Sequence, residues 1–198
     1  MLLYDSSVSG NCYKVRLLLA QLGYAYDRHE VDVVDRSDRR ELLGSLNPGL
    51  RVPTLVLDDG RALGESNAIL WFFADGTPLL PEDSFERAQV LQWMFFEQYS
   101  HEPNIAVLRF WNRFATVQPD RALVEVKRRD GRAALDAIER DLATKQFLVG
   151  DRYSIAYIAL YAYTHVAEEA GFDLSSYTEI RDWLVRVRSL PGHVPIDA

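Results

Sequence analysis

The segment covering residues 51–66 carries groups that could bind a small peptide at two places. It begins as an apolar, β-prone run, and Asp59-Gly60 is a strong signal for a tight hairpin turn. Glu65-Ser66 then opens an apolar helix over residues 68–73. The backbone at Val52 can pair with an extended peptide, and the free N–H groups at the helix start can hold a carboxylate.

A second group of chemically active side chains precedes the first expected helix. Ser9 and Asn11 can donate hydrogen bonds, and Cys12 carries the only thiol of the chain. By itself, Ser9 is typical of a helix N-cap or a turn. Cys12 falls one turn into the helix on its apolar face, so we expect a buried, unreactive thiol. The four histidines are scattered, and the sequence contains neither a Cys/His cluster nor a glycine-rich phosphate loop, so we expect no metal.

The first half of the chain predicts a mixed α/β unit that positions these groups. Its order is strand, helix, strand, short helix, two strands and a helix, which is typical of a thioredoxin-like domain. The first strand–helix–strand implies a parallel pair with a right-handed crossover. The expected elements are strands at 2–4 and 24–34, helices at 11–23 and 39–46, the hairpin, and a helix at 65–74.

The second half shows no convincing strand pattern and predicts an all-helical unit. The expected helices are 84–114 with a break near Pro103, 120–144, 154–170 and 178–188. The expected fold class is therefore α/β plus all-α. The expected divisions are a thioredoxin-like domain at 1–75, a linker at 76–83 and a helical domain at 84–198.

Several separated segments resemble the glutathione transferase superfamily. Val52-Pro53 is similar to the motif in which that family carries a cis proline, and Glu65-Ser66 is similar to its pair for the γ-glutamyl group. Residues 9–16 resemble the active-site turn and first helix of bacterial members. Residues 147–151 and 154–156 resemble the approach to the family's central helix. The resemblance implies a thioredoxin-like domain followed by an all-helical domain, with glutathione as co-substrate.

The implied chemistry is activation of the glutathione thiol. A free thiol has a pKa of about 8.5, and one hydrogen bond to the thiolate could lower it by about one or two units. Ser9 is the first candidate for this donor because serine-type members place theirs between the first strand and helix. Asn11 is a neighbouring donor, and Tyr4 occupies the strand end used by tyrosine-type members. Cys12 would instead suit a mixed disulfide with glutathione.

The resemblance also implies which residues bind the two substrates. The Val52 backbone, next to Pro53, would pair with the cysteinyl unit. Glu65 and Ser66 would hold the γ-glutamyl end, and Arg51 would reach the glycyl carboxylate. The pocket for a hydrophobic electrophile would come from the helical half. Its candidates are Tyr99, His101, Phe110 and Trp111.

Composition narrows the class of partner. The chain has 198 residues, 48% of them hydrophobic, and a net charge of −7, which argues against nucleic acid or an anionic membrane as the main partner. The start of the chain lacks a signal-peptide pattern, and the longest apolar run, 155–163, is far shorter than the ~20 residues of a membrane span. A cytoplasmic protein is expected. The family also implies a homodimer, for which the aromatic candidates are Trp71, Phe72, Phe73, Trp93 and Phe96.

Two classes of function remain open at this stage. One is an enzyme that conjugates glutathione to electrophiles, with glutathione-dependent disulfide or peroxide reduction as a related activity. The other is a non-catalytic module of the same fold that binds proteins. The intact Val52-Pro53 and Glu65-Ser66 pairs favour the enzyme, because an interaction module has no need of them.

One position departs from the family pattern. The central helix of the family begins with a serine or threonine cap and has an aspartate three residues later, forming a capping box. Here Ser154 is the cap, but Tyr157 occupies the acidic position. The change is either a natural variation that packing of the ring compensates or an introduced substitution. Taken as a defect, the departure predicts that Tyr157→Asp stabilises the protein by roughly 1 kcal/mol.

Overall fold

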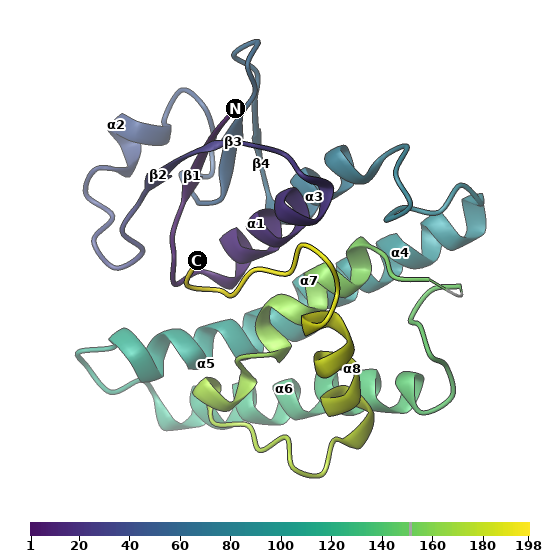
Figure 1. Cartoon of the computed structure of the whole chain (residues 1–198). Coiled ribbons are helices and arrows are strands. Elements are labelled where there is room, and N and C mark those ends of the chain that lie inside the picture. The colour runs from purple at the N-terminus through teal and green to yellow at the C-terminus, as the bar shows by residue number, and fades with distance from the viewer. Residues whose placement is uncertain (151) are drawn as a thin grey trace. The chain divides into compact units, whose positions relative to one another are not determined.

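The structure is a computed structural model of the chain, and it describes residues 1–150 and 152–198. Asp151, the last residue of the expected 147–151 loop, lies outside the described residues. The chain forms two compact units, Met1–Thr77 with Pro191–Ala198, and Pro78–Leu190 (Figure 1). Residues 191–198 thus pack with the first unit, whereas the sequence analysis grouped them with the helical one.

The first unit is built on a four-stranded mixed sheet. Its strands are β1 (Leu2–Asp5), β2 (Asp27–Glu30), β3 (Thr54–Val56) and β4 (Ala62–Gly64). The strand order is β2-β1-β3-β4, with β1 parallel to β2 and antiparallel to β3, and β3 antiparallel to β4. This topology confirms the thioredoxin-like prediction.

Three helices accompany the sheet: α1 (Gly10–Leu22), α2 (Arg39–Leu43) and α3 (Ser66–Ala74). Helix α1 packs against α3, and its central leucines, residues 17–19, are fully buried. Gly23 ends α1 with a φ of 73°, the left-handed conformation that glycine adopts without steric cost. The helix therefore ends where its sequence predicted.

Strand β2 is much shorter than the expected strand at 24–34. All four of its residues are exposed, as suits the charged edge of a sheet. The side chain of Asp32 then accepts hydrogen bonds from the N–H groups of Val34 and Asp35, at 2.7 and 3.2 Å. This local turn competes with strand pairing and ends the strand. Helix α2 likewise ends at Leu43 rather than at residue 46.

The C-terminal segment is tied to the first unit by hydrogen bonds. The Tyr13 hydroxyl donates to the carbonyl of Val194 at 2.7 Å, and the Arg28 guanidinium donates to the carbonyl of Ala198 at 2.6 Å. Gly192 has a φ of 75°, and a Cβ there would lie 2.8 Å from Cα of Gln21. Glycine at 192 therefore permits the close approach of this segment to α1.

The second unit is helical throughout its described residues. Its elements are α4 (Ser84–Phe96), the π-helical turn η1 (Glu97–His101), α5 (Glu102–Phe114), α6 (Arg121–Leu142), α7 (Ile155–Thr164), the 3-10 turn η2 (Ala167–Ala170) and α8 (Thr178–Arg188). Every residue of α7 is buried, so α7 is the central helix that its apolar sequence predicted.

The predicted break near Pro103 takes the form of the π-helical turn η1. Pro103 is the second residue of α5, and its ring cannot follow a regular α-helical turn. The wider turn before it accommodates the ring. The Asn104 side chain then donates to the carbonyl of Ser100 at 2.7 Å, which satisfies one acceptor in the altered turn.

Helix α7 ends earlier than expected, at Thr164 instead of residue 170. The Thr164 hydroxyl donates to the carbonyl of Leu160, and the His165 ring lies 2.8 Å from the carbonyl of Tyr161. Side chains that bond to the preceding turn in this way compete with the helix. Farther along, Gly171 has a φ of 85° and closes η2.

The structure places Tyr157 in the core of the second unit, and the Ser154 side chain makes no capping bond at the start of α7. The ring is buried, at 2% exposure, and it meets Trp183 edge-on with 5.7 Å between ring centroids. Its hydroxyl accepts from the N–H of Leu148 at 2.7 Å and donates to the carbonyl of Gln146 at 3.2 Å. The phenol therefore anchors the segment before α7, so the Tyr157 ring has a packing role although half of the capping box is missing.

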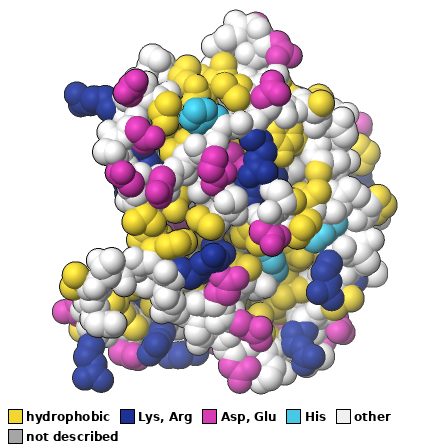
Figure 2. Space-filling model, turned by 60° about the vertical axis from the view of Figure 1, so that its left-hand side comes forward, with side chains coloured by type: hydrophobic (Ala, Val, Ile, Leu, Met, Phe, Trp, Pro, Cys, Tyr) yellow, Lys and Arg dark blue, Asp and Glu magenta, His cyan; other side chains and the backbone are white. Residues whose placement is uncertain are grey.

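Among the described residues, no helix is long and apolar enough to cross a membrane. Figure 2 shows acidic and basic side chains interspersed on the visible face.

Candidate functional site

Ser9 lies at the N-cap of α1, immediately after the loop that follows β1. Its backbone is extended, and its hydroxyl oxygen accepts from the N–H of Cys12 at 3.3 Å. A serine hydroxyl has one proton to donate in addition to its acceptor capacity. The capping bond uses the oxygen only, and the Cys12 thiol is a second hydrogen-bond partner of the Ser9 side chain.

A chain of hydrogen bonds joins Asn11 to the start of α3. The Ser66 hydroxyl donates to Oδ1 of Asn11 at 3.3 Å, and Nζ of Lys14 donates to the Ser66 hydroxyl at 3.4 Å. The structure thus brings together Asn11, a candidate for thiol activation, and Ser66, a candidate for carboxylate binding. Lys14, which is fully buried, is a residue that the sequence analysis missed. The sequence did contain a signal for Lys14, namely a positively charged residue on the inner side of an apolar helix.

Glu65 lies in a strained backbone conformation directly before α3. It has a φ of 62° and a ψ of 112°, and its side chain makes no capping bond. For a non-glycine residue such a conformation costs of order 1–3 kcal/mol and tends to occur at ligand sites. Glu65 is exposed, so its carboxylate is accessible at the start of α3.

The loop at Val52-Pro53 is held by its neighbours, and the peptide bond between these two residues is cis. The Thr54 hydroxyl donates to the carbonyl of Arg51 at 2.7 Å. The Asn47 amide donates both to that carbonyl, at 3.1 Å, and to the Thr54 hydroxyl, at 2.9 Å. The sequence analysis did not single out Asn47, so its positioning role was missed.

The remaining thiol candidates differ in accessibility. The ring of Tyr4 packs against His29 with 5.2 Å between centroids, as expected of a strand residue on a sheet. Cys12 is fully buried, and burial raises the pKa of its thiol far above the usual range. Cys12 is therefore neutral and shielded, in agreement with its expected place on the apolar face of the helix.

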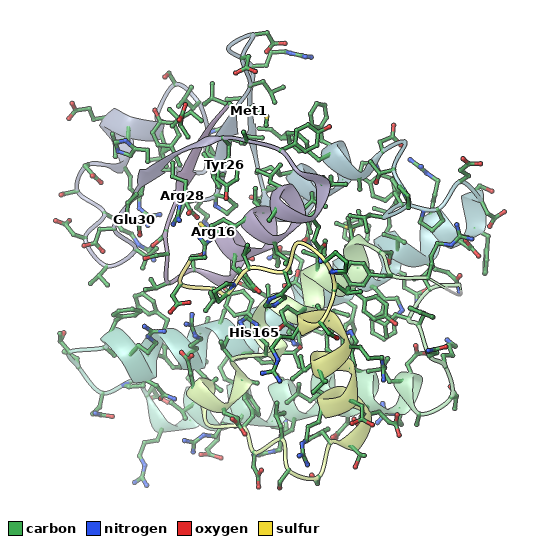
Figure 3. The ribbon with its side chains drawn as sticks, in the orientation of Figure 1. Met1, Arg16, Tyr26, Arg28, Glu30 and His165 are labelled. Atoms are coloured by element: carbon green, nitrogen blue, oxygen red, sulfur yellow. The ribbon has the colours of Figure 1, made fainter. Side chains whose placement is uncertain are left out.

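A buried ion network supports the loop that presents Ser9. The Arg16 guanidinium donates to Asp5 at 2.6 Å and to the carbonyls of Ser6 and Ser7 at 3.1 and 3.3 Å. Arg28 contacts the other oxygen of Asp5 at 2.8 Å. Figure 3 shows Arg16 and Arg28 lying close together, one from α1 and the other from β2. Because Asp5 and Arg16 are almost fully buried, this network fixes the approach to the N-terminus of α1.

The electrophile candidates of the second unit have unlike surroundings. Tyr99 is 87% exposed, whereas His101 has no exposed surface. His101 lies 2.9 Å from the Thr164 hydroxyl, whose own proton goes to Leu160, so Nε2 of His101 is the donor. His101 is thus held by Thr164 away from solvent, and its place in an electrophile pocket stays a prediction. Phe110 and Trp111 are half-buried and remain predictions.

Two other features contribute nothing to this site. Among the described residues, no three His, Cys, Asp or Glu side chains are placed to hold a metal ion. An open hollow of about 610 Å³ lies beside α2, and none of the predicted glutathione-binding residues lines it. Its lining residues are Arg40, Glu41, Gly44, Ser45, Pro48 and Leu50.

Comparison with known proteins finds relatives over nearly the whole chain. A glutathione S-transferase from Pseudomonas fluorescens Pf-5 is 49% identical, with a TM-score of 0.93 over 98% of each chain. The disulfide-bond oxidoreductase YfcG of Escherichia coli K12 is 28% identical over 92% of this chain and 87% of that protein. The transcriptional regulator URE2 of Saccharomyces cerevisiae is 25% identical over 96% of this chain and 65% of that protein. A solved structure of Ure2p in complex with glutathione has a TM-score of 0.87 at 25% identity, over 96% of this chain and 90% of that one.

Two family models match the two halves of the chain. Residues 8–75 match the glutathione S-transferase N-terminal domain, and residues 92–191 match the glutathione S-transferase C-terminal domain. The matched residues include Ser9, Val52-Pro53 and Glu65-Ser66, on which the resemblance rested. The chain belongs to the glutathione S-transferase family.

Proposed function

We propose that the protein is a cytoplasmic glutathione transferase that conjugates glutathione to hydrophobic electrophiles. The observation that carries the proposal is the contact between Asn11 and Ser66 at 3.3 Å. It puts a candidate thiol donor next to a helix start suited to a carboxylate, within one compact unit. A fully buried Cys12 leaves the thiol chemistry to a bound co-substrate.

Each residue of the site has one role in the proposed reaction. The Val52 backbone pairs with the cysteinyl unit, Glu65 and the start of α3 hold the γ-glutamyl end, and Arg51 binds the glycyl carboxylate. Ser9 donates a hydrogen bond to the glutathione sulfur, whose thiol proton leaves to solvent. The thiolate then forms a carbon–sulfur bond with the electrophile, and the leaving group departs with its electron pair. A hydrogen bond to the charged sulfur is worth about 1.5–3 kcal/mol.

Glutathione should bind the purified protein with a measurable heat at millimolar concentration. Glu65→Ala and Ser66→Ala should each weaken this binding by about 1–3 kcal/mol, because a charged group of the ligand loses its support. Glu82→Ala, an exposed position in the second unit, is the matched control and should change nothing. The measurement is calorimetric titration. Wild-type protein without any heat of binding would contradict the proposal.

Ser9→Ala should lower turnover while leaving glutathione affinity almost unchanged, since Ser9 acts mainly on the ionised thiol. The pKa of the bound thiol, followed by ultraviolet titration, should rise by about one or two units. Ser9→Thr retains both the hydroxyl and the helix cap, so it separates chemistry from the loss of the cap. An unchanged thiol pKa in Ser9→Ala would transfer the role to Asn11 or Tyr4.

Two alternatives are distinguished by turnover assays. One is glutathione-dependent disulfide or peroxide reduction, and the relative YfcG is named a disulfide-bond oxidoreductase. The other is a non-catalytic protein-binding module, and the relative URE2 is named a transcriptional regulator. Assays with aryl halides, epoxides, peroxides and glutathione mixed disulfides would identify the reaction. Glutathione binding without turnover of any of these would favour the protein-binding module.

We further propose that the protein is a homodimer, with a second copy covering an apolar stripe on the second unit. The stripe consists of Leu91, Phe95 and Tyr99, which recur every four residues along α4 and η1 and are all exposed. Phe85, at the start of α4, is also exposed. In water, such exposed apolar side chains would favour association. Of the aromatic residues expected at the interface, Phe72 is exposed, whereas Phe73 is buried in the first unit.

Sedimentation at micromolar concentration should therefore show a species of twice the chain mass of 22.7 kDa. Phe95→Glu should shift the population to the single chain, because it would introduce a charge into the covered stripe. Val185→Glu alters an exposed apolar residue on α8 and is the control that should leave the dimer intact. A wild-type protein that sediments only as a single chain would reject the dimer.

A further inference from the structure

Leu50 adopts an unfavourable backbone conformation two residues before Val52. Its φ is 50°, and Leu50 and Glu65 are the only non-glycine residues with a positive φ in the described part of the chain. The left-handed conformation brings Cβ too close to the following carbonyl oxygen, so leucine keeps it only where its surroundings hold it there. Such residues cluster at ligand sites, and Leu50 directly precedes the segment proposed to bind glutathione.

Two hydrogen bonds hold the backbone of Leu50, one on each side of the residue. Its N–H donates to the carbonyl of Asn47 at 3.0 Å, which closes a tight turn. Its carbonyl accepts from Nη1 of Arg39, the first residue of α2, at 3.1 Å. The other terminal nitrogen of the same guanidinium, Nη2, donates to the carbonyl of Asp32 at 3.1 Å. Arg39 therefore ties this turn to the segment that follows β2.

Arg39 uses its hydrogen bonds on the main chain. The residue is only 7% exposed, and both of these bonds go to backbone carbonyls. The carboxylates of Asp32 and Asp38 favour its charge without taking its donors. A planar guanidinium can donate to two acceptors in a fixed geometry, which a lysine ammonium does not reproduce. The guanidinium of Arg39 therefore fixes the direction of the Leu50 carbonyl.

The next peptide unit, between Arg51 and Val52, is fixed by two other side chains. Asn47 and Thr54 both donate to the carbonyl of Arg51, at 3.1 and 2.7 Å. This unit is planar and trans and carries its N–H opposite its carbonyl, so the N–H of Val52 points away from Asn47 and Thr54. Two successive peptide units are thus held from within the protein. The second of them carries the N–H that would pair with the cysteinyl unit of glutathione.

We propose that Arg39 is a positioning residue for the Val52 backbone, acting through the left-handed conformation of Leu50. This rests on the proposed function, since it concerns the backbone that would pair with the cysteinyl unit. Arg39 itself does not touch glutathione. Without its hydrogen bond, Leu50 relaxes to a negative φ, and glutathione binds only after the strained conformation has been restored. The free energy of that step is lost from binding.

Arg39→Met removes the guanidinium and should raise the calorimetric Kd for glutathione about tenfold. A tenfold change equals about 1.4 kcal/mol, the scale of a left-handed conformation in a residue other than glycine. Glycine adopts a positive φ without this cost, so Leu50→Gly alone should keep the wild-type Kd. Added to Arg39→Met, Leu50→Gly should return the Kd to within about threefold of the wild type.

Arg40→Met is the matched control, because Arg40 is an exposed arginine of the same helix. It should leave the Kd for glutathione unchanged. An equal loss of affinity in Arg40→Met would assign the effect to the charge of α2 and would refute the proposal. If Arg39→Met does not fold, Arg39→Lys replaces it, since lysine keeps the charge and lacks the planar fork. The same loss and the same rescue by Leu50→Gly are then expected.

The rescue by glycine separates positioning from general damage to the fold. If the wild-type protein does not bind glutathione, the proposed function fails, and this assignment fails with it. If the wild type binds but the Arg39 variant keeps the wild-type Kd, only the role of Arg39 is refuted. A loss of affinity that persists in the double variant would also refute it, because strain at Leu50 would then not be the cause.

Discussion

Tyr157→Asp should destabilise the protein by about 3–5 kcal/mol, the usual cost of deleting a large buried aromatic ring. The variant loses the packing of the ring against Trp183 and the phenol that binds Leu148 and Gln146. It also places a carboxylate where the tyrosine side chain is 2% exposed, which adds a desolvation cost. The restored capping box would contribute only about 1 kcal/mol and cannot offset these losses.

Urea denaturation at neutral pH measures this difference. Tyr157→Phe keeps the ring but leaves the Leu148 N–H without its acceptor, so a smaller cost of about 1–3 kcal/mol is expected. The two variants therefore separate the packing of the ring from the hydrogen bonds of the phenol. A higher urea midpoint for Tyr157→Asp than for the wild type would show that the cap outweighs the packing.

Arg16→Leu should destabilise the protein by about 3–5 kcal/mol, because it removes one partner of a buried ion pair. The Asp5 carboxylate is fully buried, and Arg16 contacts it at 2.6 Å. Arg28 still contacts Asp5 in the variant, which favours the lower end of this range. The carbonyls of Ser6, Ser7 and Ile196 also lose the donor that Arg16 supplies to each of them.

A double-mutant cycle tests the origin of this loss. Adding Asp5→Leu to Arg16→Leu removes the uncompensated charge, so the double variant should lose less than the sum of the two single variants. Arg61→Leu breaks the exposed ion pair with Asp59 and is the control, with little expected effect. If Arg16→Leu has the urea midpoint of the wild type, the network does not stabilise the fold. The N–H of Ser9, which bonds to the Ser6 carbonyl at 3.0 Å, should also exchange faster with solvent in Arg16→Leu.

The sequence predicted the end of a helix correctly when the residues that set this end lie next to it in the chain. Gly23 ends α1, Asp120 caps α6, and α8 runs over Thr178–Arg188 as its apolar spacing indicated. Caps, turns and helical periodicity depend on residues within a few positions of one another, so a single sequence displays them. The expected strand at 24–34 was too long because its extent depended on pairing with β1 along only four residues.

Gly131 illustrates a residue whose reason lies far away in the chain. In sequence it is only a poor helix former within the expected helix at 120–144. In the structure a Cβ at this position would lie 2.4 Å from the Phe172 ring. The close packing of this ring on the helix requires glycine, and no pattern near residue 131 could have indicated it.

By itself the sequence determined the fold class and the family. It also indicated Ser9, Val52-Pro53 and Glu65-Ser66 as site candidates, because each of these motifs is contiguous and has a local physical signature. Only the tertiary structure decided what the buried polar side chains do. Lys14 meets Ser66 across 52 positions of the chain, and Tyr157 is held by Trp183 as well as by its own neighbours. A buried charge or ring takes its role from the groups that surround it in space, and those contacts exist only once the chain has folded.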